Sequence, residues 1–184
     1  MKNYCVNSGS AQAENNLKYA LWDVLGGKAP IIVCIGTDAV QGDSLGPLVG
    51  SLLKQGLQGK AYVFGTLENP ITAKEVDCLR GFLSEVYPLS SVLAIDAALG
   101  KREEIGAVKV TDCPIKPGLG VDKDLALIGN ASIIGIVEER ALGKNLLNSV
   151  RLSLVFNQAT VIANAIKKYF QELASKDYSQ RKTI

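Results

Sequence analysis

Residues 31–47, IIVCIGTDAVQGDSLGP, decide the fold class of this 184-residue chain. The run 31–35 is apolar, mostly β-branched and closed by Gly36, which is typical of a strand buried on both faces. From Leu45 onward, apolar residues recur at helical spacing, and Pro47 is tolerated in the first turn of a helix. A buried strand that leads through a glycine-rich loop into a helix predicts an α/β fold.

The alternation of strand and helix patterns continues along the chain. Further strand patterns lie at 61–64, 92–95, 107–110 and 133–137, and helical patterns at 10–26, 71–86 and 142–173. They predict a three-layer α/β fold, in which a mostly parallel, twisted sheet carries helices on both faces. Because the segment between the strands at 92–95 and 107–110 is too short for a crossover helix, we expect these two strands to pair as an antiparallel hairpin.

Length and hydrophobic content indicate how the chain is organised. The 184 residues, 47% of them hydrophobic, suit one α/β domain that spans residues 1–184. We expect an N-terminal helical segment at 1–28 and a polar, frayed tail at 175–184. The first residues lack the apolar core of a secretory signal, and no segment is long and apolar enough to span a bilayer, so a cytoplasmic location is expected.

Charge and residue usage exclude several classes of function. The 20 basic and 18 acidic residues are scattered, which argues against a nucleic-acid or membrane-surface partner. Four cysteines lie far apart and histidine is absent, so neither a disulfide framework nor a structural zinc site is expected. Without histidine, Ser-His and Cys-His catalysis are excluded, and Cys34, in the middle of a strand, is interpreted as a core residue. We expect no cofactor and no metal.

Two aspartates near strand ends form a candidate catalytic pair. Asp43 lies in the loop after the strand at 31–35, and Asp96 directly follows the strand at 92–95. In open α/β sheets, sites form where the carboxyl ends of parallel strands meet. Neighbouring carboxylates do not both ionise cheaply, so one can take a proton from water while the other donates one to an amide. The helix N-terminus favours Asp43 as the base, and the apolar strand favours Asp96 as the acid.

Other interpretations of the acidic residues stay open. Asp43 is also placed to cap the following helix, a role that Ser44 can fill equally well. Glu68 is the best third acid for a metal-dependent hydrolase, although a solvated loop residue is the commoner role for such a side chain.

Several segments carry a family resemblance: 34–38, 42–50, 65–67, 94–97 and 115–121, with 151–155 in addition. On these residues the chain resembles the sporulation proteins of the YyaC family. That family is similar to the spore germination protease, an aspartic-type endopeptidase that degrades small acid-soluble spore proteins, and more distantly to hydrogenase maturation proteases. The resemblance implies a phosphorylase/hydrolase-like fold, catalytic roles for Asp43 and Asp96, and a protein or peptide substrate in the sporulating cell or spore. It leaves a homo-oligomer open.

Substrate-binding residues are expected around this pair. They are Gly36, Thr37, Asp38, Glu68, Pro117 and Gly118. The maturation proteases place a metal-contacting histidine in a loop comparable to that near Pro117, where this chain has glycine and leucine. The predicted function is therefore a sporulation-associated, aspartate-dependent peptidase. The alternatives are a non-catalytic sporulation factor that binds a peptide or protein, and a metal-dependent protease of the maturation type.

Overall fold

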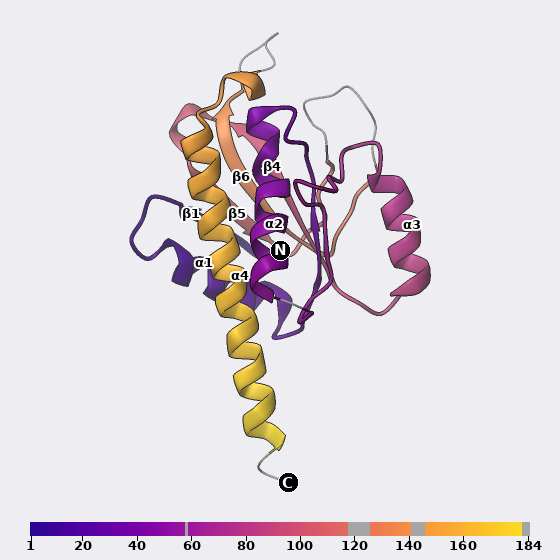
Figure 1. Ribbon diagram of the computed structural model, residues 1–184. Coiled ribbons are helices and arrows are strands. Elements are labelled where there is room, and N and C mark those ends of the chain that lie inside the picture. Colours follow the sequence, from indigo (N-terminus) through magenta and orange to yellow (C-terminus); the bar gives the residue numbers. More distant parts are fainter. Residues whose placement is uncertain (58, 118–125, 141–145, 182–184) are drawn as a thin grey trace.

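The computed structural model describes residues 1–57, 59–117, 126–140 and 146–181 (Figure 1). Within these residues, six strands form one sheet in the order β1-β5-β6-β4-β2-β3. The strands are β1 (Asn3–Asn7), β2 (Ile31–Cys34), β3 (Val63–Phe64), β4 (Val92–Gly100), β5 (Ala107–Thr111) and β6 (Ala131–Glu139). The helices are α1 (Ala13–Leu25), α2 (Leu45–Leu57), α3 (Val76–Val86) and α4 (Leu152–Arg181), with the short 3-10 turns η1 (Gln41–Ser44), η2 (Arg102–Glu104) and η3 (Leu146–Ser149).

The sheet is mostly parallel, as predicted. β2 pairs in parallel with both β3 and β4, and β4 pairs in parallel with β6. β5 runs against both of its neighbours, β1 and β6. The predicted hairpin of β5 with β4 is wrong, because β2 and β6 already occupy the two edges of β4 and β5 therefore pairs with the outer edge of β6.

Helices cover both faces of the sheet, which confirms the three-layer α/β prediction. α1, α2 and α4 pack on one face, and α3 packs on the other (Figure 1). The side chains of β2 alternate between the two faces of the sheet. Ile32 and Cys34 belong to the core under α2 and α4, while Val33 belongs to the core under α3. All four residues of β2 are buried, as expected for a strand covered on both sides.

Both ends of the chain differ from the sequence prediction. Part of the segment expected to be helical is the edge strand β1, which pairs with β5 in the register Asn3↔Thr111. The last helix begins at Leu152, later than predicted, and continues to Arg181 through residues that were expected to fray. In this stretch Lys176 pairs with Glu172 (Nζ–Oε1 3.1 Å), and its ammonium lies 3.6 Å from the centre of the Trp22 ring, which ties the helix to α1.

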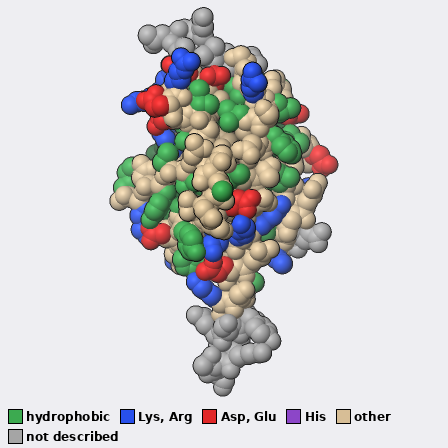
Figure 2. Space-filling view, turned by 90° about the vertical axis from the view of Figure 1, so that its left-hand side faces the viewer, with side chains coloured by type: hydrophobic (Ala, Val, Ile, Leu, Met, Phe, Trp, Pro, Cys, Tyr) green, Lys and Arg blue, Asp and Glu red, His purple; other side chains and the backbone are tan. Residues whose placement is uncertain are grey.

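Ion pairs also connect α1 and α4 along their length. Lys18 contacts Glu172 at 2.8 Å, and Glu14 contacts Lys168 at 2.8 Å. Figure 2 shows acidic and basic side chains interspersed on the side of the molecule that faces left in Figure 1. Among the residues that the structure describes, no helix is both long and apolar enough to cross a membrane.

Candidate functional site

The loop after β2 folds back over the end of the strand. Gly36 has φ +135°, and a Cβ at this position would lie 2.0 Å from the backbone oxygen of Asp43. The Thr37 N–H donates to that same oxygen at 3.1 Å, while the Gly36 N–H donates to Ile71 O at 2.9 Å. The loop is thus closed on itself, and Asp43 is held directly above the end of β2.

Close backbone contacts also bring α2 down onto the sheet. A Cβ on Gly46 would lie 2.0 Å from Ile35 O, and a Cβ on Gly50 would lie 1.8 Å from Gly65 O. These glycines permit backbone contact, which gives a steric reason for their spacing. The first turn of α2, and Asp43 just before it, are fixed relative to β2 by this contact.

Asp43 is half-buried in η1, one residue before Ser44 and the start of α2. Burial raises the pKa of the Asp43 carboxyl, and a hydrogen bond from the Thr37 backbone N–H opposes this rise. The pKa is therefore raised, whereas the position of Asp43 before a helix was expected to favour the ionised form. The Ser44 hydroxyl donates to Gln41 O at 2.6 Å instead of accepting a bond as a helix cap.

Asp96 is buried in β4, next to the end of β2. Its neighbour Ile95 accepts a hydrogen bond from the Ile35 N–H at 2.7 Å, the last such contact before the chain turns at Gly36. The Asp96 carboxylate accepts the Ala97 N–H at 2.8 Å and retains 8% exposure. β4 continues to Gly100, so Asp96 lies within the strand and does not directly follow it as predicted. Because the adjacent parallel strand β2 ends at Cys34, opposite Ile95, and η1 packs against β4, both aspartates lie beyond the carboxyl end of β2.

The other predicted residues occupy different surroundings. Gly36 is buried and serves the turn, Thr37 is half-buried and bonds to Asp43, and Asp38 is exposed. Glu68 is exposed in the loop after β3, and Pro117 is buried. Gly118 lies outside the described residues. Within the described part of the chain, no group of three or more Cys, Asp or Glu side chains is arranged to hold a metal ion.

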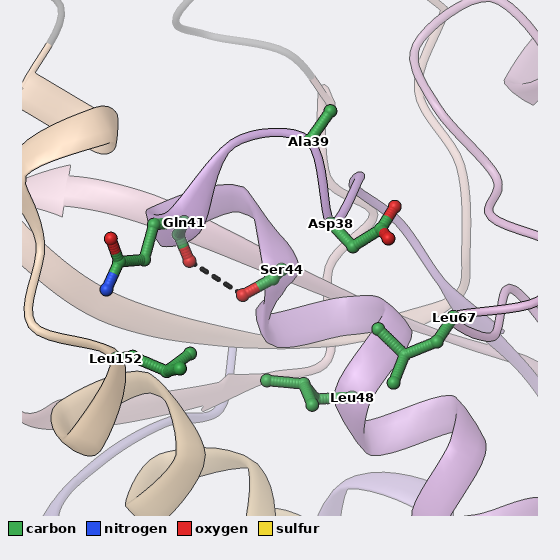
Figure 3. A pocket seen from close by; sticks show the side chains of 7 residues that line it. All are labelled: Asp38, Ala39, Gln41, Ser44, Leu48, Leu67 and Leu152. Carbon is green, nitrogen blue, oxygen red and sulfur yellow. Dashed lines mark hydrogen bonds between the residues drawn. The ribbon is translucent and has the colours of Figure 1, made fainter.

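A pocket of about 430 Å³ opens beside this loop (Figure 3). Its lining residues are Asp38, Ala39, Gln41, Ser44, Leu48, Leu67 and Leu152. Of these, the sequence prediction included Asp38 alone. Leu67 lies in the segment 65–67 that carried the family resemblance, but nothing in the linear order of the chain links it with Leu48 or Leu152.

Cys34 is fully buried, and burial raises the pKa of its thiol. This fits the predicted core role, because a nucleophilic cysteine requires a lowered pKa and access to substrate.

Comparison with known proteins identifies the family. A family model described as "Protein of unknown function (DUF1256)" matches residues 2–165. The chain belongs to this family. "Uncharacterized protein YyaC" of Bacillus subtilis (strain 168) is 40% identical to it over 141 residues, which are 76% of this chain and 69% of that protein. The predicted resemblance to YyaC is confirmed.

A solved structure is similar to this fold. The crystal structure of the [NiFe] hydrogenase maturation protease HycI from Thermococcus kodakarensis KOD1 matches with a TM-score of 0.48 and 20% sequence identity. The match covers 80% of this chain and 98% of that chain.

Proposed function

We propose that this protein is a peptidase that hydrolyses amide bonds of a protein or peptide with Asp43 and Asp96 as its catalytic pair. The observation that carries the proposal is the position of two desolvated carboxyl groups beyond the carboxyl end of β2, one in β4 and one in the turn η1 that packs against β4. Burial raises the pKa of Asp43, so this carboxyl group holds a proton more readily than a solvated aspartate does.

The chemistry requires a single proton on the pair. The ionised carboxylate takes a proton from a water molecule as its oxygen attacks the amide carbon, and the protonated carboxyl donates its proton to the carbonyl oxygen. As the tetrahedral intermediate collapses, one of its hydroxyl groups returns its proton to the pair and re-forms the C=O bond, the C–N bond breaks, and the leaving nitrogen takes up a proton from the pair. The products are one carboxylic acid and one amine, and the pair again holds one proton.

The first substrates to test are small acid-soluble spore proteins, because of the resemblance to the germination protease. Purified protein is incubated with them, and peptide products are followed by mass spectrometry. Asp43→Asn and Asp96→Asn are each expected to lower the rate by at least about 100-fold, the usual contribution of a general acid or base. Asp77→Asn, at an exposed position in α3, is the matched control. Cleavage that persists in both site variants would overturn the proposal, as would a wild-type protein that yields no products.

A binding protein without turnover is the second candidate. The leucine-lined pocket beside the loop favours it, because such a pocket can hold a polypeptide whether or not a bond is cut. Saturable binding of the same spore proteins without products would identify this function.

A further inference from the structure

Three leucine side chains converge on the pocket beside η1. Leu48 comes from α2, Leu67 from the loop after β3 and Leu152 from the start of α4. Figure 3 shows all three directed toward a common hollow below the η1 turn. Leu67 and Leu152 keep 39% and 53% of their surface exposed. A concave apolar surface from three separate elements is typical of a ligand site and differs from single exposed leucines.

The rim of this pocket carries polar groups that suit a peptide backbone. The Ser44 hydroxyl is engaged with Gln41 O, but the Gln41 amide and the Asp38 carboxylate have no hydrogen-bond partner among the residues that the structure describes. A glutamine amide both donates and accepts, and a carboxylate accepts from an N–H. Figure 3 shows the two side chains on opposite sides of the loop, so they suit two different peptide groups of a chain that passes over the leucines.

The pocket lies beside the turn that carries Asp43, although neither Asp43 nor Asp96 lines it. Gln41 and Ser44 line it, and Asp43 lies between them in the same 3-10 turn. An extended polypeptide advances roughly 3.3 Å per residue, so a chain over Asp43 places a side chain one or two residues away within reach of the leucines. The volume of about 430 Å³ is enough for a side chain and its flanking peptide groups and too small for a folded domain.

We propose that this pocket is a specificity subsite that accepts an aliphatic side chain of the polypeptide substrate, close to the bond that is cut. The inference rests on the proposed function and adds the substrate feature that the site selects. The leucines bury the aliphatic side chain, while Gln41 and Asp38 bond to separate peptide groups on either side of it.

The first test compares two leucines of similar exposure. Leu152→Lys places a charge in the pocket, whereas Leu127→Lys changes a residue that is 56% exposed and lies outside it. With small acid-soluble spore proteins as the probe, we expect Leu152→Lys to lower kcat/KM by at least about 10-fold, as for loss of an apolar specificity contact. Leu127→Lys is expected to match wild type, and Leu152→Met to retain most of the activity.

A second readout separates a subsite from a purely structural role. Mass spectrometry of the products is expected to show an aliphatic residue at a fixed offset from each cleaved bond. Leu48→Phe, which fills the hollow, is expected to shift this preference to smaller side chains. Unchanged kcat/KM in Leu152→Lys, together with an unchanged cleavage profile, overturns the inference while the peptidase proposal stands.

If the wild-type protein gives no products, the subsite is tested by binding instead of cleavage. Fluorescence anisotropy of the labelled spore protein is then measured with the wild-type, Leu152→Lys and Leu127→Lys proteins. Binding weakened by Leu152→Lys alone supports the subsite although the peptidase proposal has failed. Equal binding by all three proteins, or no binding, overturns the subsite as well.

Discussion

Asp43 holds its carboxyl group in the folded protein at a cost to stability. Its backbone oxygen closes the loop through Thr37, while its carboxyl group is drawn out of water. A folded-state pKa above the unfolded value means that the folded protein holds this proton more tightly than the unfolded chain does. Stability therefore falls as the pH rises from the unfolded pKa, about 3.9, through the folded pKa.

Asp43→Asn is expected to stabilise the protein at neutral pH, because the neutral amide avoids the cost of a buried charge and still accepts the Thr37 N–H. The melting temperature should rise by a few degrees, at about 2–4 °C per kcal/mol for a chain of this size. Near about pH 3, where the aspartate is protonated in both states, the gain should vanish. Thermal unfolding across this pH range measures the effect, and a gain that does not depend on pH would contradict it.

The cysteines are expected to differ sharply in reactivity. Cys5 and Cys78 are exposed, whereas Cys34 is buried with a raised pKa. A thiol reagent at mildly alkaline pH should modify Cys5 and Cys78 rapidly in the folded protein and Cys34 only after unfolding. Cys78→Ala should remove one rapid equivalent, and Cys34→Ala none. If Cys34→Ala instead shows one rapidly modified thiol fewer than wild type, Cys34 is accessible and β2 opens in the native state.

At the scale of elements, the junction of β2 and α2 depends on glycines that no side chain can replace. Gly36→Ala places a methyl group against Asp43 O in a backbone region that L-residues rarely adopt. We expect a loss of about 2–4 kcal/mol from strain and overpacking, measured by denaturant unfolding. Gly81→Ala is the control, because a Cβ there meets nothing within 4 Å; in helix α3 it should stabilise by roughly 0.5–1 kcal/mol. Equal effects of the two substitutions would exclude the steric explanation.

The elements that the sequence predicts well are those with a local signal. Residues 31–57 carry their periodicity and their turn residues within one stretch, so the strand, the loop and the helix were all predictable. The position of β5 was not, because its partner depends on which edges of β4 and β6 remain free. β1 was missed for a related reason: its burial pattern is almost entirely exposed, and its strand character comes from pairing with β5.

At the scale of the whole molecule, one part of the candidate site also has a local sequence signal and the other part has none. Asp43 and Asp96 could be proposed from the sequence because Asp43 lies in the loop after one apolar run and Asp96 directly follows another. The pocket was not predicted, because Leu48, Leu67 and Leu152 are each ordinary for their own element. Only the packing of α2, α4 and the loop after β3 makes them neighbours.

The edge strand β1 closes one side of the sheet, and its deletion tests what it contributes to the whole molecule. It covers the outer edge of β5, and its end is tied to α1, where Lys2 Nζ lies 3.0 Å from the Asp23 carboxylate and the Tyr4 hydroxyl donates to that carboxylate at 2.6 Å. A chain without residues 1–7 begins at Ser8. The N–H and the hydroxyl of Ser8 both donate to Gly106 O, so its first residue is still attached to the rest of the fold.

Deletion of residues 1–7 is expected to lower the melting temperature by several degrees and to cause concentration-dependent self-association, because an uncovered strand edge pairs with other chains. Thermal unfolding and sedimentation velocity measure the two effects. Tyr4→Phe, which removes one exposed hydrogen bond and keeps β1, should cost no more than about 1 kcal/mol and stay in the oligomeric state of wild type. If the truncated protein instead keeps the wild-type oligomeric state and melting temperature, β1 is dispensable, and the rest of the described sheet with its helices suffices to hold Asp43 and Asp96 beyond the end of β2.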